Sequence, residues 1–179
     1  MREVALEVLE ESDVEQFILD NQQAFRYGAL EEFGQRDNHF EEDGEIISRS
    51  TIEKSIKEGI AYRIIADGRK VGGAVVHTFG STGELDLLFI IPSEHTKGIG
   101  TMAWDLIEKM YPQVKHWETM TPYFEKRNIH FYINKCGFKI VEFFCEFHTG
   151  IKENENDEML ENQNDKNLDG MFRFVKEID

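Results

Sequence analysis

The chain has 179 residues, of which 40% are hydrophobic and 12% aromatic, and this composition is typical of one folded globular domain. Its 35 acidic and 20 basic residues give a formal net charge of −15. A surface this acidic repels the phosphates of nucleic acids and anionic lipids, so we expect neither a nucleic acid nor a membrane as a partner.

The N-terminal part of the chain predicts a strand, a helix and a region that is harder to assign. Apolar and polar residues alternate over 4–9, a pattern typical of a strand. Ser12 and Glu15 then form a capping box, which predicts a helix over about 13–25. Residues 26–50 are rich in Glu, Asp and Gly and predict a loop or short helices.

The rest of the chain predicts a mixture of strands and helices. Asp67 and Gly68 stand between two β-rich runs, which is a strong hairpin signal. The almost continuous apolar run at 84–91 predicts a central strand that is covered on both faces. In chain order, the predicted elements are a helix at 51–58, strands at 61–67, 70–78 and 84–91, a helix at 99–111, a strand at 115–120, a helix at 125–136, and strands at 139–147 and 171–178.

These elements follow the order β-α-(α)-β-β-β-α-β-α-β-β, a mixed α/β pattern that is neither strictly alternating nor segregated. We therefore expect a single domain over 1–179. The polar and acidic segment at about 149–170 is typical of a loop insertion, here between the last two predicted strands. Because no apolar run is long enough to span a membrane and the first residues lack a signal-peptide pattern, we expect a cytoplasmic protein.

The segment at 90–107 carries the clearest chemical signal. A buried strand ends at Pro92, a short polar loop follows, and Gly98 and Gly100 then open an amphipathic helix. Glycines let the backbone approach a ligand closely because they have no Cβ atom. The first turn of a helix has unpaired N–H groups and carries the positive end of the helix dipole. Together these features predict a site for a phosphate or pyrophosphate group.

This segment resembles the pyrophosphate loop of the GNAT N-acetyltransferases, which reads Arg/Gln-x-x-Gly-x-Gly/Ala a few residues after a proline. Here the loop reads His95-Thr96-Lys97-Gly98-Ile99-Gly100, with His95 where Arg or Gln is usual. A second match lies downstream, where the family often has an Asn, a helical Tyr and a Gly-Phe pair that opens a strand. The matching residues are Asn128, Tyr132, Gly137 and Phe138. The resemblance covers about 4–147, and 171–178 fits the last strand of the family.

The resemblance implies a GNAT-like domain with a central mixed, mostly antiparallel, twisted sheet flanked by helices. It implies an acetyltransferase that moves the acetyl group of acetyl-CoA to a primary amine of a small molecule or peptide by direct attack. Acetyl-CoA is then a cosubstrate, and no metal is expected. In the family, the strand edge pairs with the pantetheine arm and the loop holds the pyrophosphate. The implied CoA-binding residues are Phe89, Ile90, Ile91, His95, Thr96, Lys97, Gly98, Ile99, Gly100, Thr101 and Asn128.

The resemblance also implies the catalytic residues. Direct transfer needs a neutral amine, a group that accepts its proton, and a group that hydrogen-bonds to or protonates the departing thiolate. Tyr132 matches the general acid, and Glu84 and Asp86 lie in the strand region where many members carry a base. Strand periodicity puts both carboxylates on one face with Leu88 and Ile90.

The acceptor is less well defined by the sequence. An acidic group lies in the region that often covers the acceptor site in this family, which leads to the hypothesis of a cationic amine. Its members are Glu31, Glu32, Asp37, Glu41, Glu42 and Asp43. Since GNAT proteins often form dimers, a homodimer is compatible with the resemblance.

Two other functions stay open. A GNAT fold can bind acyl-CoA or a partner without turnover. A dinucleotide-binding oxidoreductase is the other alternative, since the glycines at 98 and 100 with Ala103 fit GxGxx(G/A). The two cysteines, Cys136 and Cys145, are too far apart for a CxxC motif, and no His or Cys cluster has zinc spacing, so free thiols are expected.

Overall fold

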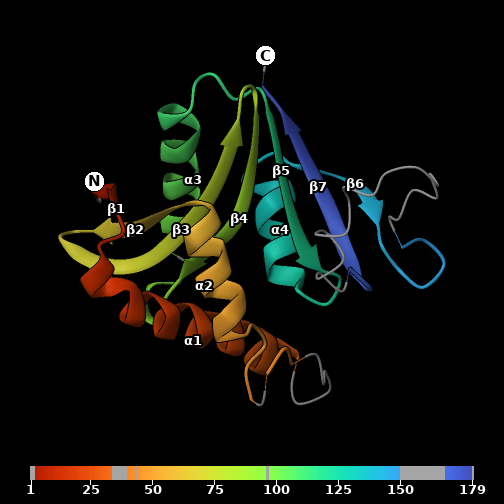
Figure 1. The fold of residues 1–179 in the computed structure, drawn as a ribbon, viewed down its shortest axis with the longest axis horizontal. Coiled ribbons are helices and arrows are strands. Elements are labelled where there is room, and N and C mark those ends of the chain that lie inside the picture. The colour runs from red at the N-terminus through yellow and green to blue at the C-terminus, as the bar shows by residue number, and fades with distance from the viewer. Residues whose placement is uncertain (1–2, 34–39, 43, 96, 150–167, 179) are drawn as a thin grey trace.

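A seven-stranded sheet with the strand order β1-β2-β3-β4-β5-β7-β6 forms the centre of the molecule (Figure 1). The computed structural model describes residues 3–33, 40–42, 44–95, 97–149 and 168–178, with only the backbone of 29–33. The strands are β1 (Val4–Val8), β2 (Ile60–Ala66), β3 (Arg69–Phe79), β4 (Thr82–Ile90), β5 (His116–Pro122), β6 (Lys139–Phe143) and β7 (Met171–Glu177). The helices are α1 (Val14–Phe33), α2 (Arg49–Glu58), α3 (Ile99–Met110) and α4 (Lys126–Asn134), with short 3-10 helices at Glu11–Asp13 and Pro92–Glu94.

The sheet is mixed and mostly antiparallel, as the resemblance implied. Among the described strands, β4 and β5 form the one parallel pair, and every other neighbouring pair is antiparallel. A doubly wound dinucleotide-binding fold needs a mostly parallel sheet, so this topology does not match the oxidoreductase alternative.

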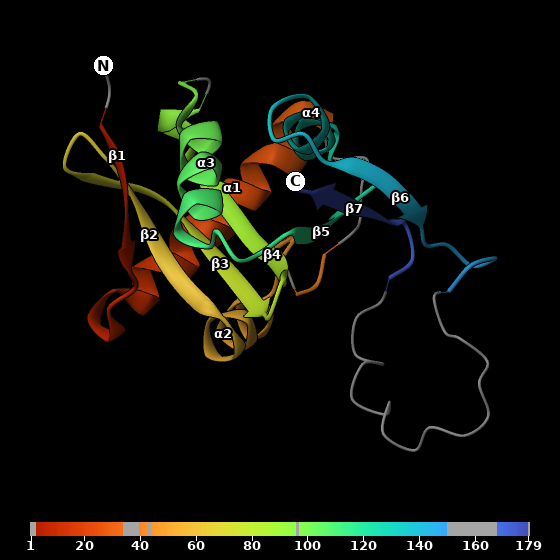
Figure 2. The same ribbon diagram turned by 90° about the horizontal axis from the view of Figure 1, so that it is seen from above.

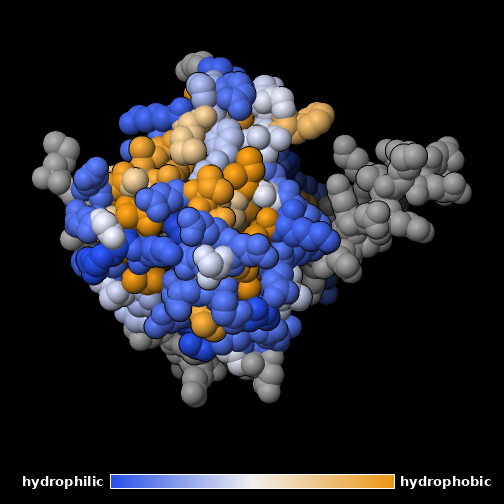
Figure 3. Space-filling view, turned by 60° about the vertical axis from the view of Figure 1, so that its left-hand side comes forward, coloured by the Kyte–Doolittle hydropathy of each residue, from blue (hydrophilic) through white to orange (hydrophobic). Residues whose placement is uncertain are grey.

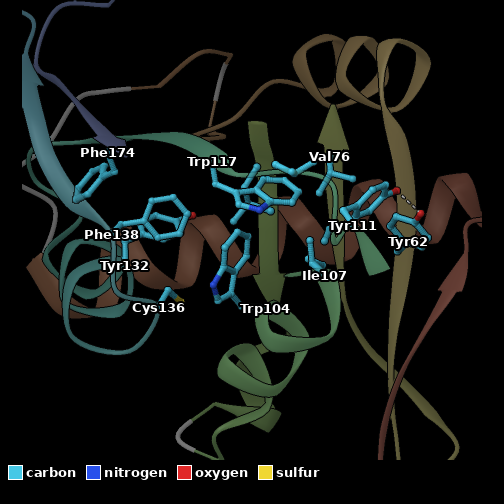
Figure 4. Close-up of a cluster of buried hydrophobic side chains, with 13 residues drawn as sticks. Tyr62, Val76, Trp104, Ile107, Tyr111, Trp117, Tyr132, Cys136, Phe138 and Phe174 are labelled. Atoms are coloured by element: carbon cyan, nitrogen blue, oxygen red, sulfur yellow. Dashed lines mark hydrogen bonds between the residues drawn. The ribbon is translucent and has the colours of Figure 1, made fainter. Parts of the chain in front are cut away.

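Helices cover both faces of the sheet, and Figure 2 shows α3 and α2 on opposite sides of the strands. On one face, Phe17 and Ile18 of α1 and Ile52 of α2 pack with Val75, Leu87 and Phe89 of the sheet. On the other face, Trp104 and Ile107 of α3 and Tyr132 of α4 pack with strands β2 to β5 and β7. Figure 4 shows the aromatic side chains of this second cluster.

Two predicted boundaries are wrong. The first helix continues to Phe33, whereas the sequence predicts a helix that ends near residue 25 and is followed by a loop or short helices. Gly28 lowers helix propensity, but the residues around it are good helix formers, and Gly28 itself is buried next to the carboxylate of Glu125. The strand after α4 ends at Phe143 and not at residue 147, because Cys145 and His148 close a turn with each other.

The surface combines polar cover with scattered apolar groups. The face in Figure 3 carries hydrophilic side chains over most of its area, with apolar patches among them. No helix in the described part of the chain combines the length and the apolar character that crossing a bilayer requires. Most of the predicted insertion at 149–170 lies outside the described residues.

Candidate active site

A fork in the sheet creates the candidate site. The parallel strands β4 and β5 pair over three residue pairs, from Thr82 with His116 to Glu84 with Glu118. The hydroxyl of Thr119 then donates to the carbonyl oxygen of Leu85 at 2.8 Å, which satisfies an acceptor where the pairing stops. Beyond this point the two strands diverge, and α4 lies beside the opening (Figure 1).

A cavity of about 430 Å³ lies at the open end of the fork. This volume is within the range of small-molecule sites in proteins. Its walls come from α1, the end of β4, the start of α3, and α4. The lining residues are Ala24, Phe25, Gly28, Leu88, Phe89, Ile90, Glu94, His95, Lys97, Gly98, Ile99, Gly100, Thr101, Glu125, Arg127, Asn128, His130, Phe131, Tyr132 and Lys135.

The start of α3 has the features of an anion site. Gly98 is the N-cap with φ of 74° and makes no side-chain cap hydrogen bond. A residue with a Cβ atom rarely adopts this left-handed conformation, which explains the first glycine. The second glycine is explained by close packing, since a Cβ on Gly100 would lie 3.2 Å from the ring of Phe131. The first turn of this 12-residue helix therefore lines the cavity, and the N-cap residue provides no side chain to cap it.

Polar side chains fix the loop that precedes α3. The ring of His95 lies 2.6 Å, measured from Nε2, from the carbonyl oxygen of Ile90. Lys97 pairs with buried Glu94 at 2.9 Å, and Arg69 pairs with the same carboxylate at 3.1 Å. The hydrogen bond from Lys97 lowers the pKa of Glu94, so the carboxylate stays charged. These contacts hold Lys97 at the end of the cavity where α3 begins.

Most of the predicted CoA-binding residues meet in this cavity. The lining includes nine of them, namely Phe89, Ile90, His95, Lys97, Gly98, Ile99, Gly100, Thr101 and Asn128. Ile91 instead packs against the cluster of β2, β3 and α3, and its amide donates to Val71 at 2.9 Å. Thr96 lies outside the described residues. Asn128 is not the helix cap, because that position belongs to Glu125, and its amide lies 3.5 Å from the hydroxyl of Thr121.

Tyr132 belongs both to the cavity wall and to the aromatic core. Its side chain is 6% exposed, and its ring lies 5.7 Å from that of Phe138 and 5.5 Å from that of Phe174 (Figure 4). Burial raises the pKa of the Tyr132 hydroxyl, and the charges of Glu125 and Asp86 act in the same direction. The hydroxyl therefore keeps its proton at neutral pH. Cys136 lies in the same cluster and is 3% exposed.

The two predicted carboxylates of β4 do not line the cavity. A bulge in β4 places Asp86 between Leu85 and Leu87, which pair with consecutive residues of β3. Asp86 accepts a hydrogen bond from Ser55 of α2, and His77 lies 3.4 Å from the same oxygen. The prediction that Asp86 shares a face with Leu88 and Ile90 is wrong, because the bulge reverses the alternation and those side chains pack toward α3.

The acidic group that was expected to cover the acceptor lies largely outside the described side chains. Of its members, Glu41 accepts hydrogen bonds from Ser48 and Thr51, and Glu42 accepts one from Gln22 at 3.0 Å. Neither carboxylate lines the cavity. Among the described residues, no group of three or more His, Cys, Asp or Glu side chains could hold a metal ion.

Several cavity residues were not identified from the sequence. They include Glu125, Arg127, His130 and Lys135 of the α4 region and three residues of α1. The α4 residues lie on either side of Asn128 and Tyr132 in the sequence, so helical periodicity around the motif could have indicated which face of α4 lines the cavity. The α1 residues carry no such signal, because their position depends on how α1 packs across the sheet.

Comparison with known proteins identifies the family. Residues 24–138 match the acetyltransferase (GNAT) family. The chain belongs to this family. The resemblance to the GNAT family that the loop motif carries is thereby confirmed. This GNAT protein is also 44% identical over 180 residues to the uncharacterized protein YrkN of Bacillus subtilis strain 168, a match that covers 97% of this chain and 92% of the relative.

Solved structures of low sequence identity share the fold of this GNAT protein. The PaiA N-acetyltransferase of Thermoplasma acidophilum in complex with coenzyme A has a TM-score of 0.62 at 15% identity, covering 98% of this chain and 99% of that one. A Bacillus subtilis acetyltransferase in complex with CoA has a TM-score of 0.61 at 18% identity, covering 99% of each chain. The single GNAT-like domain with its mixed, mostly antiparallel sheet is therefore confirmed.

Proposed function

We propose that the protein is an N-acetyltransferase that transfers the acetyl group of acetyl-CoA to a primary amine. The observation that carries this proposal is the cavity at the fork, which the start of α3 and the largely buried Tyr132 line together. Family membership supports the reaction class, and two of the structures that share the fold contain CoA. The acceptor is a small molecule or a peptide.

The residues of the cavity fit acetyl-CoA. The first-turn amides of α3 suit a pyrophosphate, and the cations of Lys97, Arg127 and Lys135 line the same cavity. Phe89 and Ile90 lie where β4 has left β5, so their backbone edge is suited to pair with an extended pantetheine arm. When bound, acetyl-CoA supplies a thioester that is reactive toward a neutral amine.

Side chains of the protein would accept the proton of the amine and donate one to the departing sulfur. An alkylamine with a pKa near 10.4 costs roughly 4–5 kcal/mol to deprotonate at pH 7, so a proton acceptor accelerates the reaction. We assign this task to the β4 carboxylates Glu84 and Asp86, acting through water because neither of them lines the cavity. Tyr132 keeps its proton and is suited to donate a hydrogen bond or proton to the departing sulfur.

The first experiment is thermal unfolding with and without acetyl-CoA, with NADH as the control. A ligand that binds only the folded protein raises Tm. We expect a rise with acetyl-CoA and none with NADH. A rise with NADH alone would contradict the proposal and favour the dinucleotide alternative.

Turnover is tested separately by thiol release with a broad panel of amines. We expect CoA release that depends on one class of amine. Saturable acetyl-CoA binding without turnover of any amine would instead support a non-catalytic acyl-CoA-binding module.

A further inference from the structure

A buried threonine lies at the point where the fork in the sheet opens. Thr119 is 1% exposed, and its hydroxyl donates to the carbonyl oxygen of Leu85 at 2.8 Å, just beyond the last paired residues of β4 and β5. A threonine hydroxyl has one proton to donate and two lone pairs that accept hydrogen bonds. Because its proton goes to Leu85, the Thr119 oxygen can still accept a hydrogen bond from another donor.

The strand pairing places this hydroxyl on the side of the sheet where Tyr132 lies. Thr119 is directly opposite Phe174 in the antiparallel pair of β5 and β7, and opposite residues in such a pair point to the same face. Phe174 is fully buried, and its ring lies 5.5 Å from the ring of Tyr132 (Figure 4). Trp117, two residues earlier on β5, belongs to the same cluster as Tyr132. The threonine therefore faces the tyrosine that lines the cavity.

The hydrogen bond between these two hydroxyls favours the ionised tyrosine. Burial and nearby groups raise the pKa of Tyr132, and Thr119 is the one described residue whose contact lowers it. A hydrogen bond has this effect where the partner donates to the phenolate oxygen. Since a hydroxyl can rotate, Thr119 can accept from Tyr132 while the phenol is protonated and donate to it once the proton has left.

We infer that Thr119 is a positioning residue for Tyr132, which orients the phenol hydroxyl and stabilises the phenolate left when Tyr132 gives its proton to the sulfur of acetyl-CoA. This inference rests on the proposed acetyltransferase function. Tyr132 passes its proton to the sulfur as the carbon–sulfur bond breaks and leaves its electron pair on sulfur. Tyr132 then regains a proton from solvent before the next turnover. The Thr119 hydroxyl turns from Leu85 to the phenolate and back.

The test compares Thr119→Val, which removes the hydroxyl and keeps the branched shape, with Thr119→Ser, which keeps the hydroxyl. With benzylamine as the acceptor, we expect kcat of Thr119→Val to fall roughly tenfold, the loss of one hydrogen bond to a charged group. KM for acetyl-CoA should change by less than about threefold, and Thr119→Ser should keep kcat within about threefold of wild type. Thr78→Val, at a half-buried position of β3 outside the cavity lining, is the matched control and should leave kcat unchanged.

A double-mutant cycle separates this role from a purely structural one. In Tyr132→Phe no phenol proton is transferred, so adding Thr119→Val should lower kcat by less than about twofold. If Thr119 acted only by joining the two strands at Leu85, its loss would lower kcat by the same factor with and without the Tyr132 hydroxyl.

An NMR measurement accompanies the kinetics and does not depend on turnover. With tyrosine isotopically labelled at the ring carbon that bears the hydroxyl, the signal that disappears in Tyr132→Phe belongs to Tyr132. We expect this signal to shift in Thr119→Val but not in Thr78→Val. A rise in Tm with acetyl-CoA shows that each variant is folded.

Three results would overturn the inference: an unshifted Tyr132 signal in Thr119→Val, a wild-type kcat in that variant, or an equal loss of kcat with and without the Tyr132 hydroxyl. Failure of the wild-type protein to turn over any amine would instead count against the proposed function. The Tyr132 signal would then decide whether the two hydroxyls interact.

Discussion

The two ends of the cavity are built in different ways. The α3 end, at residues 98–101, consists of a helix start and two glycines, so backbone amides are the groups suited to bind a ligand there. The α4 end, at 125–132, consists of side chains that other elements bring together, among them Glu125 and Tyr132. The first kind of site is encoded in a short continuous segment, and the second depends on how α4 and α1 pack.

The largest effect is expected at the α3 end. Gly100→Asp should weaken acetyl-CoA binding by roughly 10²–10⁴-fold, the loss of about two charge-assisted hydrogen bonds. Its Cβ would crowd the Phe131 ring at 3.2 Å, and its charge would repel phosphate. Calorimetric titration with acetyl-CoA measures the change. Gly100→Ala separates the effect of bulk from that of charge. Unchanged acetyl-CoA affinity in Gly100→Asp would contradict the assignment of an anion site to this helix start.

A smaller effect is expected at the α4 end. Tyr132→Phe should lower kcat by roughly 100-fold with little change in acetyl-CoA affinity, because the ring stays and the proton donor is lost. Steady-state kinetics and calorimetry together measure this. Tyr62→Phe is the matched control, since its hydroxyl bonds that of Tyr111 at 2.5 Å in the same cluster (Figure 4) and does not line the cavity. A wild-type rate in Tyr132→Phe would exclude the assigned role.

The strand carboxylates should give a still smaller effect. Asp86→Asn should lower kcat/KM for an alkylamine by roughly tenfold at pH 7. The deficit should shrink as the pH approaches the pKa of the amine, because solvent then supplies the neutral nucleophile. Glu84→Gln is measured in parallel, and the larger deficit identifies the proton acceptor. A pH-independent deficit in both variants would contradict a role in proton removal.

The closed end of the fork should show the smallest effect. His116 contacts Glu118 at 2.7 Å and Glu177 at 2.5 Å, and these carboxylates, Glu118 first, raise the pKa of the imidazole. Its stabilisation is therefore complete below the unfolded pKa, near 6.5, and is lost as the pH rises through the higher folded value.

The variant His116→Gln measures this contribution. It should lower the free energy of unfolding by about 0.2–1 kcal/mol at about pH 6, the range of exposed ion pairs, and by less at about pH 9. Denaturant unfolding at both pH values checks the sign. A larger deficit at the higher pH would contradict the assignment.

The sequence predicted the α3 end better than the α4 end for physical reasons. The glycines at 98 and 100 identify a helix start by local rules, and nine CoA-binding candidates line the cavity. The orientation of Asp86 was missed because a bulge leaves no mark in strand periodicity. Glu125 was missed because the sequence places it at the start of a predicted helix, and its position beside Gly28 depends on how α1 packs.

The packing of Cys136 has a practical consequence for following the reaction. Burial raises the pKa of this thiol to about 12, so almost none of it is thiolate at neutral or mildly alkaline pH. Since thiolates are the species that attack disulfide and alkylating reagents, Cys136 should not react with these reagents while the protein is folded. A colorimetric thiol reagent would then report the CoA thiol released from acetyl-CoA, with the more accessible Cys145 as the source of background to replace by serine.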